Sequence, residues 1–194
     1  MSDIKVSLHY LEERKLHPTR GARFAASHRL RLTNAYNVAG QIAASVMLII
    51  WSIVPLAVEV PSPKAFALLG VAASIAILAL TLHQQAGAYV DASRSLEASA
   101  RAIDRLRNEV AADIAAGLAE DSDRYRERSA QYANVLDENP VNHTELDVVV
   151  SRAQSSGCFG RVRAMLILHF RAGIGFWLCV ALVLLPATIV FRNG

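Results

Sequence analysis

The sequence predicts an all-α membrane protein with a transmembrane helical hairpin, a long cytoplasmic helical region and a third, C-terminal transmembrane helix. Hydrophobic residues make up 53% of the 194 residues and the mean hydropathy is +0.29, above what a soluble domain usually carries. These residues are concentrated in three uncharged runs. The stretch between the second and third runs is rich in Ala, Leu, Arg and Glu, which favour helix.

The first two runs predict the hairpin, residues 38–82. Residues 38–58 are 21 residues without a charge, and at about 1.5 Å per residue such a helix matches a hydrocarbon core roughly 30 Å thick. This run is too long, and starts too far from the N-terminus, for a signal peptide. Residues 59–64 contain two prolines, which end one helix and permit another to begin. Residues 65–82 are therefore the second span, after a very short connection.

The third run, residues 173–190, has 18 residues and lies at the lower length limit for a span. Arg171 and Arg192 bracket it. A buried helix of a soluble domain is the alternative interpretation. We expect residues 173–194 to form a third apolar segment that crosses the membrane.

The distribution of basic residues predicts the orientation. Seven Lys or Arg residues precede the first span and eleven Arg residues lie between the second and third, whereas the short connection has one Lys and the C-terminus one Arg. Because basic residues are enriched on the cytoplasmic side, residues 1–37 and 83–172 are expected in the cytoplasm and the C-terminus outside.

Residues 83–120 contain no proline and predict a helix that continues without interruption from the second span. One apolar stripe of helical period runs along it: Leu96, Ile103, Leu106, Val110, Ile114 and Leu118. Asp121 and Asp123 predict a break and a new helix start. A shorter stripe then follows, with Tyr125, Tyr132 and Leu136, and ends before Pro140. The two stripes predict antiparallel helical packing, within one chain or between subunits.

The most polar run is NPVNHTELD, residues 139–147. Thr144 followed three residues later by Asp147 has the capping-box pattern, and Asn142 with Glu145 offers the same pattern. The run therefore predicts a helix start, with His143 and Asp147 one turn apart and able to pair. A metal or catalytic site is the alternative, but two ligands are too few for a structural metal ion. We expect no cofactor.

The first membrane helix carries a polar stripe on one face: Asn34, Asn37, Gln41, Ser45 and Ser52. Polar groups in hydrocarbon need a partner or water, so the stripe should face protein or an aqueous path. It predicts either hydrogen bonding between helices in a closed bundle or the lining of a pore. In the second helix, Gly70 and Ser74 form a small-xxx-small pattern that lets helices pack closely. One hairpin cannot enclose a channel, so a pore requires oligomerisation.

Motifs for catalysis are missing from the sequence. It contains no P-loop, dinucleotide-binding loop, nucleophile elbow or spaced metal-ligand set, so we expect no enzyme. The formal charge of +3 predicts no broad surface for nucleic acid. Arg124, Arg126 and Arg128 could bind a nucleotide phosphate, or form a solvated helix face.

Together these features resemble a known family. Two closely spaced membrane helices and a long helix, followed by Tyr132, Leu136, Asn139, Asn142-His143 and Asp147, resemble the bacterial SLATT family (SMODS- and SLOG-associating two-transmembrane effectors). The resemblance runs from about Arg29 through the third apolar run. It makes Tyr132, Leu136, Asn142, His143 and Asp147 family-motif positions with a structural role.

The resemblance implies an effector of a bacterial antiviral defence system in the inner membrane. Such an effector is expected to oligomerise and to form a pore or disrupt the membrane when a partner protein or nucleotide signal triggers it. Its partners would be the lipid bilayer, other copies of the chain, and a protein that produces or senses the signal. The alternative function is a non-conducting membrane anchor or scaffold for a cytoplasmic helical module.

Overall fold

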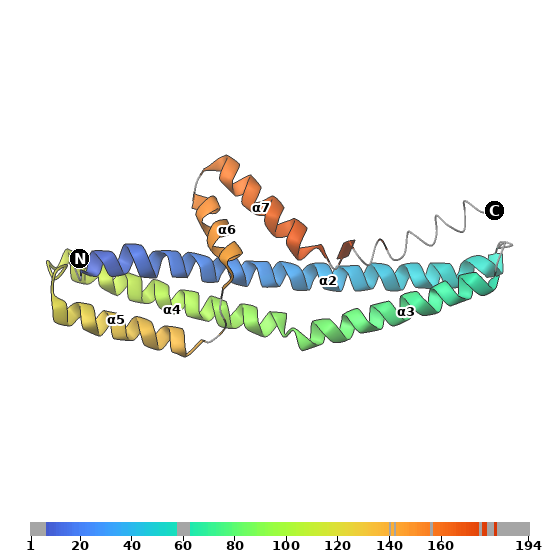
Figure 1. Cartoon of the computed structure of the whole chain (residues 1–194), viewed down its shortest axis with the longest axis horizontal. Helices are drawn as coiled ribbons and strands as arrows, with labels where there is room; N and C mark the ends of the chain where they lie inside the picture. The colour runs from blue at the N-terminus through green and yellow to red at the C-terminus, as the bar shows by residue number, and fades with distance from the viewer. Residues whose placement is uncertain are drawn as a thin grey trace. The chain divides into compact units, whose positions relative to one another are not determined.

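The computed structural model describes residues 7–57, 63–139, 141, 143–155, 157–174, 176–177 and 181. All regular elements in these residues are helical (Figure 1), which confirms the all-α class. In chain order they are α1 (Leu8–Tyr10), the π-helical turn η1 (Leu11–Leu16), α2 (His17–Ala57), α3 (Pro63–Ala86), α4 (Tyr89–Ala115), α5 (Ser122–Asp137), α6 (Glu145–Ser155) and α7 (Cys158–Ala172). The chain divides into two compact units. The first comprises Met1–Leu30 and Val90–Leu168, and the second Arg31–Tyr89 and His169–Gly194.

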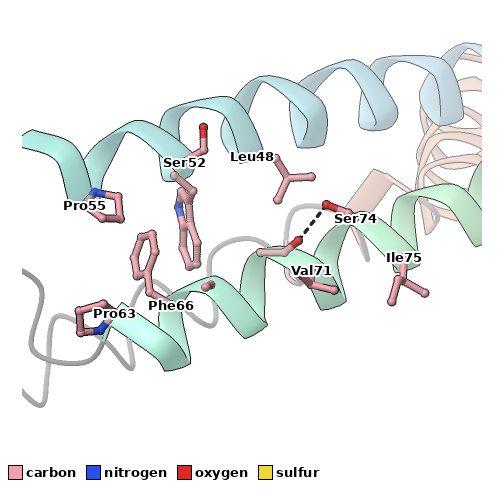
Figure 2. A pocket seen from close by; sticks show the side chains of 11 residues that line it. Leu48, Ser52, Pro55, Pro63, Phe66, Val71, Ser74 and Ile75 are labelled. Carbon is pink, nitrogen blue, oxygen red and sulfur yellow. Dashed lines mark hydrogen bonds between the residues drawn. The ribbon is translucent and has the colours of Figure 1, made fainter.

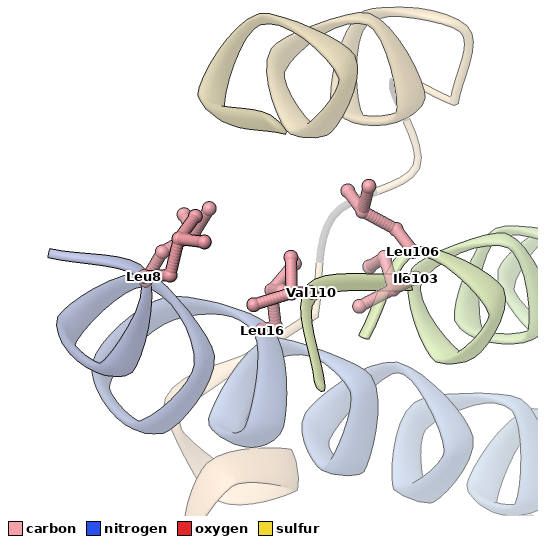
Figure 3. Packing of buried hydrophobic residues seen from close by; sticks show 6 residues of the cluster. Leu8, Leu16, Ile103, Leu106 and Val110 are labelled. Atoms are coloured by element: carbon pink, nitrogen blue, oxygen red, sulfur yellow. The ribbon is translucent and has the colours of Figure 1, made fainter. Parts of the chain in front are cut away.

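The first unit has a core to which three distant parts of the chain contribute. Leu8, Leu11 and Leu16 pack against three residues of the α4 stripe, Ile103, Leu106 and Val110 (Figure 3). The α5 stripe covers this core with partly buried side chains, namely Tyr125, Tyr132, Val135 and Leu136. The two stripes thus pack together within one chain, and the N-terminal helix completes their core. The sequence pattern did not predict a helix in this N-terminal segment.

A π-helical turn explains how the N-terminal segment buries its leucines. Leu11 and Leu16 are five residues apart, and in a regular α-helix residues at that spacing do not share a face. The turn over Leu11–Leu16 has i to i+5 hydrogen bonding, which brings residues at that spacing one above the other. Both leucines are therefore fully buried.

Two helix ends differ from the prediction. The expected continuous helix from the second span into the cytoplasmic region is wrong, because α3 ends at Ala86 and a turn at Gly87 and Ala88 precedes α4. Ala88 has a positive φ of 42°, which is uncommon for a residue with a side chain. α4 also ends at Ala115 rather than near residue 120. Gly117, with a φ of 83°, closes it in a Schellman arrangement, in which the Leu118 amide donates to the Asp113 carbonyl at 3.1 Å.

The new start at Asp121 lies where the sequence predicts it. The Asp121 side chain accepts hydrogen bonds from the amides of Asp123 and Arg124, at 2.9 and 3.0 Å, and so caps α5. The Leu8 amide donates to the Ala119 carbonyl in the preceding loop, at 3.0 Å. This bond ties the N-terminal helix to the α4–α5 connection.

The second unit contains the predicted hairpin. The first span is the last part of α2, and the second span lies within α3, Pro63–Ala86. Ala44 is buried against Met47 and Ile77, and Trp51 stacks on Phe66 with ring centroids 4.8 Å apart. Gln41 donates a hydrogen bond to Thr81 at 3.0 Å. The predicted third span, residues 173–190, falls largely outside the described residues.

The apolar surface of the hairpin is that of a membrane protein. Among the described residues, one helix, Leu8–Ile53, is long and apolar enough to cross a membrane, and a shorter apolar helix covers Phe66–Ala79. Only 11% of the apolar window in the first helix is buried, whereas the core helix of a soluble protein would be mostly buried. Large apolar side chains of both helices are instead exposed, including Ile42, Ile49, Ile53, Leu68, Ile75 and Leu78. Such a surface needs lipid or other protein against it.

Candidate functional site

The polar run 139–147 builds a helix start around a buried carboxylate. α6 begins at Glu145, which puts Thr144 at the N-cap, and the Thr144 amide donates to Asp147 Oδ2 at 2.8 Å. The Thr144 hydroxyl also donates to Asp147 Oδ2, at 2.8 Å. This is the carboxylate half of a capping box, at the spacing that the sequence predicts. Asn142, the other predicted cap, lies outside the described residues.

Asp147 also pairs with Arg29 of α2. Arg29 Nε donates to Oδ1 at 2.8 Å and Nη2 to Oδ2 at 3.1 Å, a bidentate arrangement. The Asp147 side chain is fully buried. Burial opposes its ionisation, but the hydrogen bonds from Arg29 and Thr144 outweigh burial and lower the pKa of Asp147. Asp147 is therefore an ionised carboxylate that joins the start of α6 to α2.

A second polar cluster surrounds Arg23, a residue of α2 that the sequence analysis did not select. Arg23 is only 4% exposed. Its guanidinium donates to the Ser99 hydroxyl on α4 and to the Asn139 carbonyl, the latter at 3.5 Å. Asn139 is itself 8% exposed, and its side-chain amide donates to the Ser95 carbonyl. Arg23 thus joins α2, α4 and the end of α5.

A cavity of about 260 Å³ lies beside this cluster. Three family-motif residues line it together with four others: Tyr132, Leu136 and His143, with Thr19, Arg23, Asn139 and Val141. The hydroxyls of Thr19 and Tyr132 are hydrogen-bonded to each other at 2.8 Å. The structure therefore brings most of the described motif residues to one cavity, whereas Asp147 lies outside its lining.

Two basic side chains that line the cavity, Arg23 and His143, have lowered pKa values. Burial lowers the pKa of Arg23, although the guanidinium remains charged at physiological pH. Burial, and then the positive charge of Arg23, lower the pKa of His143, against the smaller raising effect of Asp147. His143 is therefore neutral near pH 7, and Arg23 carries the positive charge among the lining residues that the structure describes.

The other charged side chains considered as ligand sites are the possible metal ligands and the arginines of α5. Within the described part of the chain, no three His, Cys, Asp or Glu side chains are grouped closely enough to hold a metal ion. The three predicted phosphate-binding candidates of α5 each pair with a carboxylate. Arg124 bonds Glu127 at 2.6 Å, Arg126 bonds Asp123 at 3.4 Å, and Arg128 bonds Asp113 at 2.8 Å and Glu109.

The residues of the polar stripe on the first span differ in burial within the second unit. Asn37 is buried and Gln41 is half-buried, with its bond to Thr81 on α3. Ser45 and Ser52 are exposed, and the Ser52 hydroxyl donates to the Ile49 carbonyl at 2.7 Å. Hydrogen bonding between helices thus occurs at Gln41, while the lining of a pore by this stripe stays a prediction.

Gly70 and Ser74 lie beside a groove between α2 and α3 (Figure 2). The groove has a volume of about 520 Å³, and Trp51, Ser52, Pro55, Phe66, Gly70 and Ser74 are among its lining residues. The Ser74 hydroxyl donates to the Gly70 carbonyl at 2.9 Å. A Cβ added at Gly70 would meet no atom of the described residues within 4 Å. Close packing at Gly70 therefore requires a helix other than α2 or α3.

The Arg23 cluster could not be read directly from the sequence, because its members come from residues 19–23, 99 and 132–143. One local signal was present. Ala22, Ala25 and Ala26 form a stripe of small residues at helical spacing that is buried in the structure. A helical interpretation of this stripe would have placed Arg23 beside a buried face.

Comparison with known proteins gives one match. The model of the SMODS and SLOG-associating 2TM effector domain family 5 matches residues 8–192. No curated protein and no solved structure matches the chain. The family match includes the N-terminal helix, both hairpin helices and the Arg23 cavity. Since it covers nearly the whole chain, the protein belongs to the SMODS and SLOG-associating 2TM effector domain family 5 and is a two-transmembrane effector of conflict systems.

Proposed function

We propose that this protein is a membrane effector of bacterial antiviral defence that oligomerises through its hairpin and permeabilises the inner membrane. A partner protein or a nucleotide signal triggers it, and no catalytic step is involved. The observation that carries the proposal is the open groove of the hairpin. Ser52, Gly70 and Ser74 lie at this groove, and a single chain leaves Gly70 without a packing neighbour among the described residues.

The packing of the first unit supports the membrane topology of this proposal. Residues before the first span and residues after the second span share one core, since Leu8, Leu11 and Leu16 contact Ile103, Leu106 and Val110. This shared core supports the proposal that both flanks of the hairpin lie on the same side of the bilayer, as two crossings require. The excess of basic residues in these flanks favours the cytoplasmic side.

Assembly follows from what the hairpin leaves exposed. Lipid can cover the isoleucines and leucines, but it gives no hydrogen bonds to Ser45 and no close backbone contact at Gly70. A helix of a second copy in the groove would contact Gly70 and Ser74. Several hairpins arranged in this way would enclose a path that two helices alone cannot enclose.

Cysteine crosslinking combined with flux measurement tests this proposal. In a Cys158→Ser/Cys179→Ser background, Gly70→Cys should form disulfide-linked oligomers in membranes. Leu68→Cys is the matched control, because Leu68 is 70% exposed and lies on the opposite side of the same helix. Liposomes containing the purified chain should release potassium when crosslinkable oligomers are present.

Expression in cells, with and without the protein encoded beside it, provides the triggered condition. Loss of membrane potential should require that neighbour and should accompany Gly70→Cys crosslinking. Crosslinking without any depolarisation or flux would favour the anchor or scaffold function. A Gly70→Cys variant that remains monomeric while flux persists would contradict assembly through the groove.

A further inference from the structure

We propose that the cavity beside Arg23 is a binding site for the phosphate group of a small ligand. This inference goes beyond the proposed function and does not depend on conduction. It rests on three features of the first unit, namely a buried positive charge without a carboxylate, a cavity next to that charge, and hydroxyl groups in the cavity wall.

The charge of Arg23 is not neutralised within the described chain. Its partners there, the Ser99 hydroxyl and the Asn139 carbonyl, are both uncharged, and no described carboxylate pairs with it. Arg29 and Arg128, by contrast, each bond a buried or half-buried aspartate. A buried charge is costly unless it is paired, and arginine does not lose its proton to escape this cost. An anion in the adjacent cavity would supply the missing charge.

The chemistry of the cavity favours phosphate over a carboxylate. Arg23 Nε is a buried donor, and Asn139 Oδ1 a buried acceptor, and neither has a hydrogen-bond partner among the described residues. A hydrogenphosphate, or a phosphate ester with a nearby hydroxyl, both accepts and donates hydrogen bonds, whereas an ionised carboxylate only accepts them. The hydroxyls of Thr19 and Tyr132 bond each other, which leaves one of their two protons as a further donor in the wall. Among the described residues of the lining there is no Asp or Glu side chain that would repel an anion.

The size of the cavity limits the ligand. About 260 Å³ lies just below the range of about 300 to 1,000 Å³ that is usual for drug-sized ligands. The space is sufficient for a phosphate group with a small organic substituent such as a pentose. The phosphate could come from a soluble compound or from the headgroup of an anionic lipid, and the two sources are distinguished by experiment.

Thr19 provides a matched pair of variants. Thr19 and Arg23 are four residues apart on α2 and both line the cavity, so an acidic side chain at residue 19 can pair with Arg23. Thr19→Asp therefore supplies an internal carboxylate that competes with a bound anion. Thr19→Asn introduces a side chain of nearly the same shape as aspartate but without its charge. Because the two variants disturb packing alike, a difference between them reports on the anion.

The binding test uses the full-length chain in an uncharged detergent. Inorganic phosphate and ribose 5-phosphate are titrated by calorimetry, and chain in nanodiscs containing phosphatidate is compared with chain in phosphatidylcholine nanodiscs by lipid retention. Wild type and Arg101→Gln should bind alike, since Arg101 is an exposed cation that pairs with Glu97. Thr19→Asn loses a wall hydroxyl but adds no charge, so it should bind more tightly than Thr19→Asp. Thr19→Asp and Arg23→Gln should bind the phosphate probes at least tenfold more weakly than wild type does.

Each outcome has a defined meaning. Saturable binding of the soluble phosphates that Thr19→Asp abolishes supports a soluble ligand. Retention of phosphatidate alone, again abolished by Thr19→Asp but not by Thr19→Asn, supports a lipid headgroup. Absence of saturable binding to all of these probes, or equal binding by Thr19→Asp and Thr19→Asn, overturns the proposal. Binding is measured without flux, so a failure of the conduction proposal leaves this result unaffected.

Discussion

At the scale of single residues, two arginines of α2 show how neighbouring charges take different roles. Arg29 meets the fully buried carboxylate of Asp147, and this pair is further bonded by Thr144. Arg23 meets only neutral groups among the described residues and lies at a cavity. The first arrangement is complete without a ligand. The second has a net charge, so a difference in anion binding between these two positions is expected.

Substitution of Asp147 should strongly destabilise the first unit. Asp147→Asn keeps the shape but leaves Arg29, which is 22% exposed, without its carboxylate. Breaking a buried pair in this way typically costs 3–5 kcal/mol, and we expect about 3 kcal/mol because Arg29 retains some contact with solvent. Asp91→Asn is the control, since Asp91 is 81% exposed and its loss should cost less than about 0.5 kcal/mol. Unfolding in detergent measures both, and equal stability of the two variants would contradict a structural role for Asp147.

His143 should make the first unit less stable in weak acid. Burial, and then Arg23, lower its pKa in the folded protein, while the unfolded chain has the ordinary value of about 6.5. Below that pH the unfolded state binds more protons than the folded state, so stability falls as the pH drops from about 6.5 towards the folded pKa. His143→Gln should remove this part of the pH dependence. Melting temperatures between pH 5 and pH 8 provide the measurement, and parallel curves for wild type and variant would refute it.

At the scale of helices, the sequence predicted those helix starts that depend on contacts between residues close together in the chain. The starts of α5 at Asp121 and of α6 at Thr144 depend on caps within three residues, and the sequence predicts both. The turn at Gly87 and Ala88 interrupts a stretch without proline, and no local signal outweighed its helical composition. The helical N-terminal segment was not predicted, because its π-helical turn spaces Leu11 and Leu16 five residues apart, outside the period of a regular α-helical stripe.

For the candidate site, too, the sequence predicted contacts between residues close together in the chain and not those between distant residues. The sequence indicates Tyr132, His143 and Asp147 as motif positions and the capping contact of Asp147, but not the residues that complete each cluster. Arg29 and Arg23 lie more than 100 positions away from their partners Asp147 and Asn139. Contacts between such distant positions depend on how α2 packs against α4 and α6. For example, a Cβ at Gly21 would overlap the Ser151 hydroxyl, so the Ser151 side chain would have to turn away to admit it.

The cap of α6 should act through Asp147. Thr144→Ala removes the hydroxyl that donates to Asp147 Oδ2 and should cost about 1 kcal/mol, the usual cost of a lost cap. Thr144→Ser keeps the hydroxyl and serves as the control. In an Asp147→Asn background the cost of Thr144→Ala should shrink, because the two groups share one bond. Unfolding free energies of the four combinations measure this coupling, and strictly additive costs would contradict it.

At the scale of the whole molecule, the long helix α2 begins in the helical first unit and continues without a break into the hairpin of the second unit. α2 contributes Arg23 and Arg29 to the first unit and Gln41 and Ser45 to the second. The sequence predicted the hairpin because two uncharged runs are a local property of the chain. It did not predict that residues 7–30 and 90–168 share one core, which is a property of the folded molecule.

This shared core makes the membrane topology testable with three cysteines. In a Cys179→Ser background, an impermeant thiol reagent applied to intact cells should label Lys64→Cys, in the first turn of α3 beside the hairpin connection, and should not label Glu120→Cys. The native Cys158 is exposed in the first unit and is an internal control in every variant. Glu120→Cys and Cys158 should become reactive together when the membrane is permeabilised, because both belong to the first unit, which we propose lies on the cytoplasmic side.

Two results would contradict this topology in different ways. Labelling of Glu120→Cys but not Lys64→Cys in intact cells would reverse the orientation while leaving the hairpin intact. Labelling of Glu120→Cys without Cys158 would separate two parts of the first unit by a membrane. That second result is incompatible with the folded unit, since a backbone hydrogen bond joins Leu8 to Ala119 and the Arg29–Asp147 pair joins α2 to α6. Equal reactivity of Glu120→Cys and Cys158 therefore tests the packing of the first unit as well as its side of the membrane.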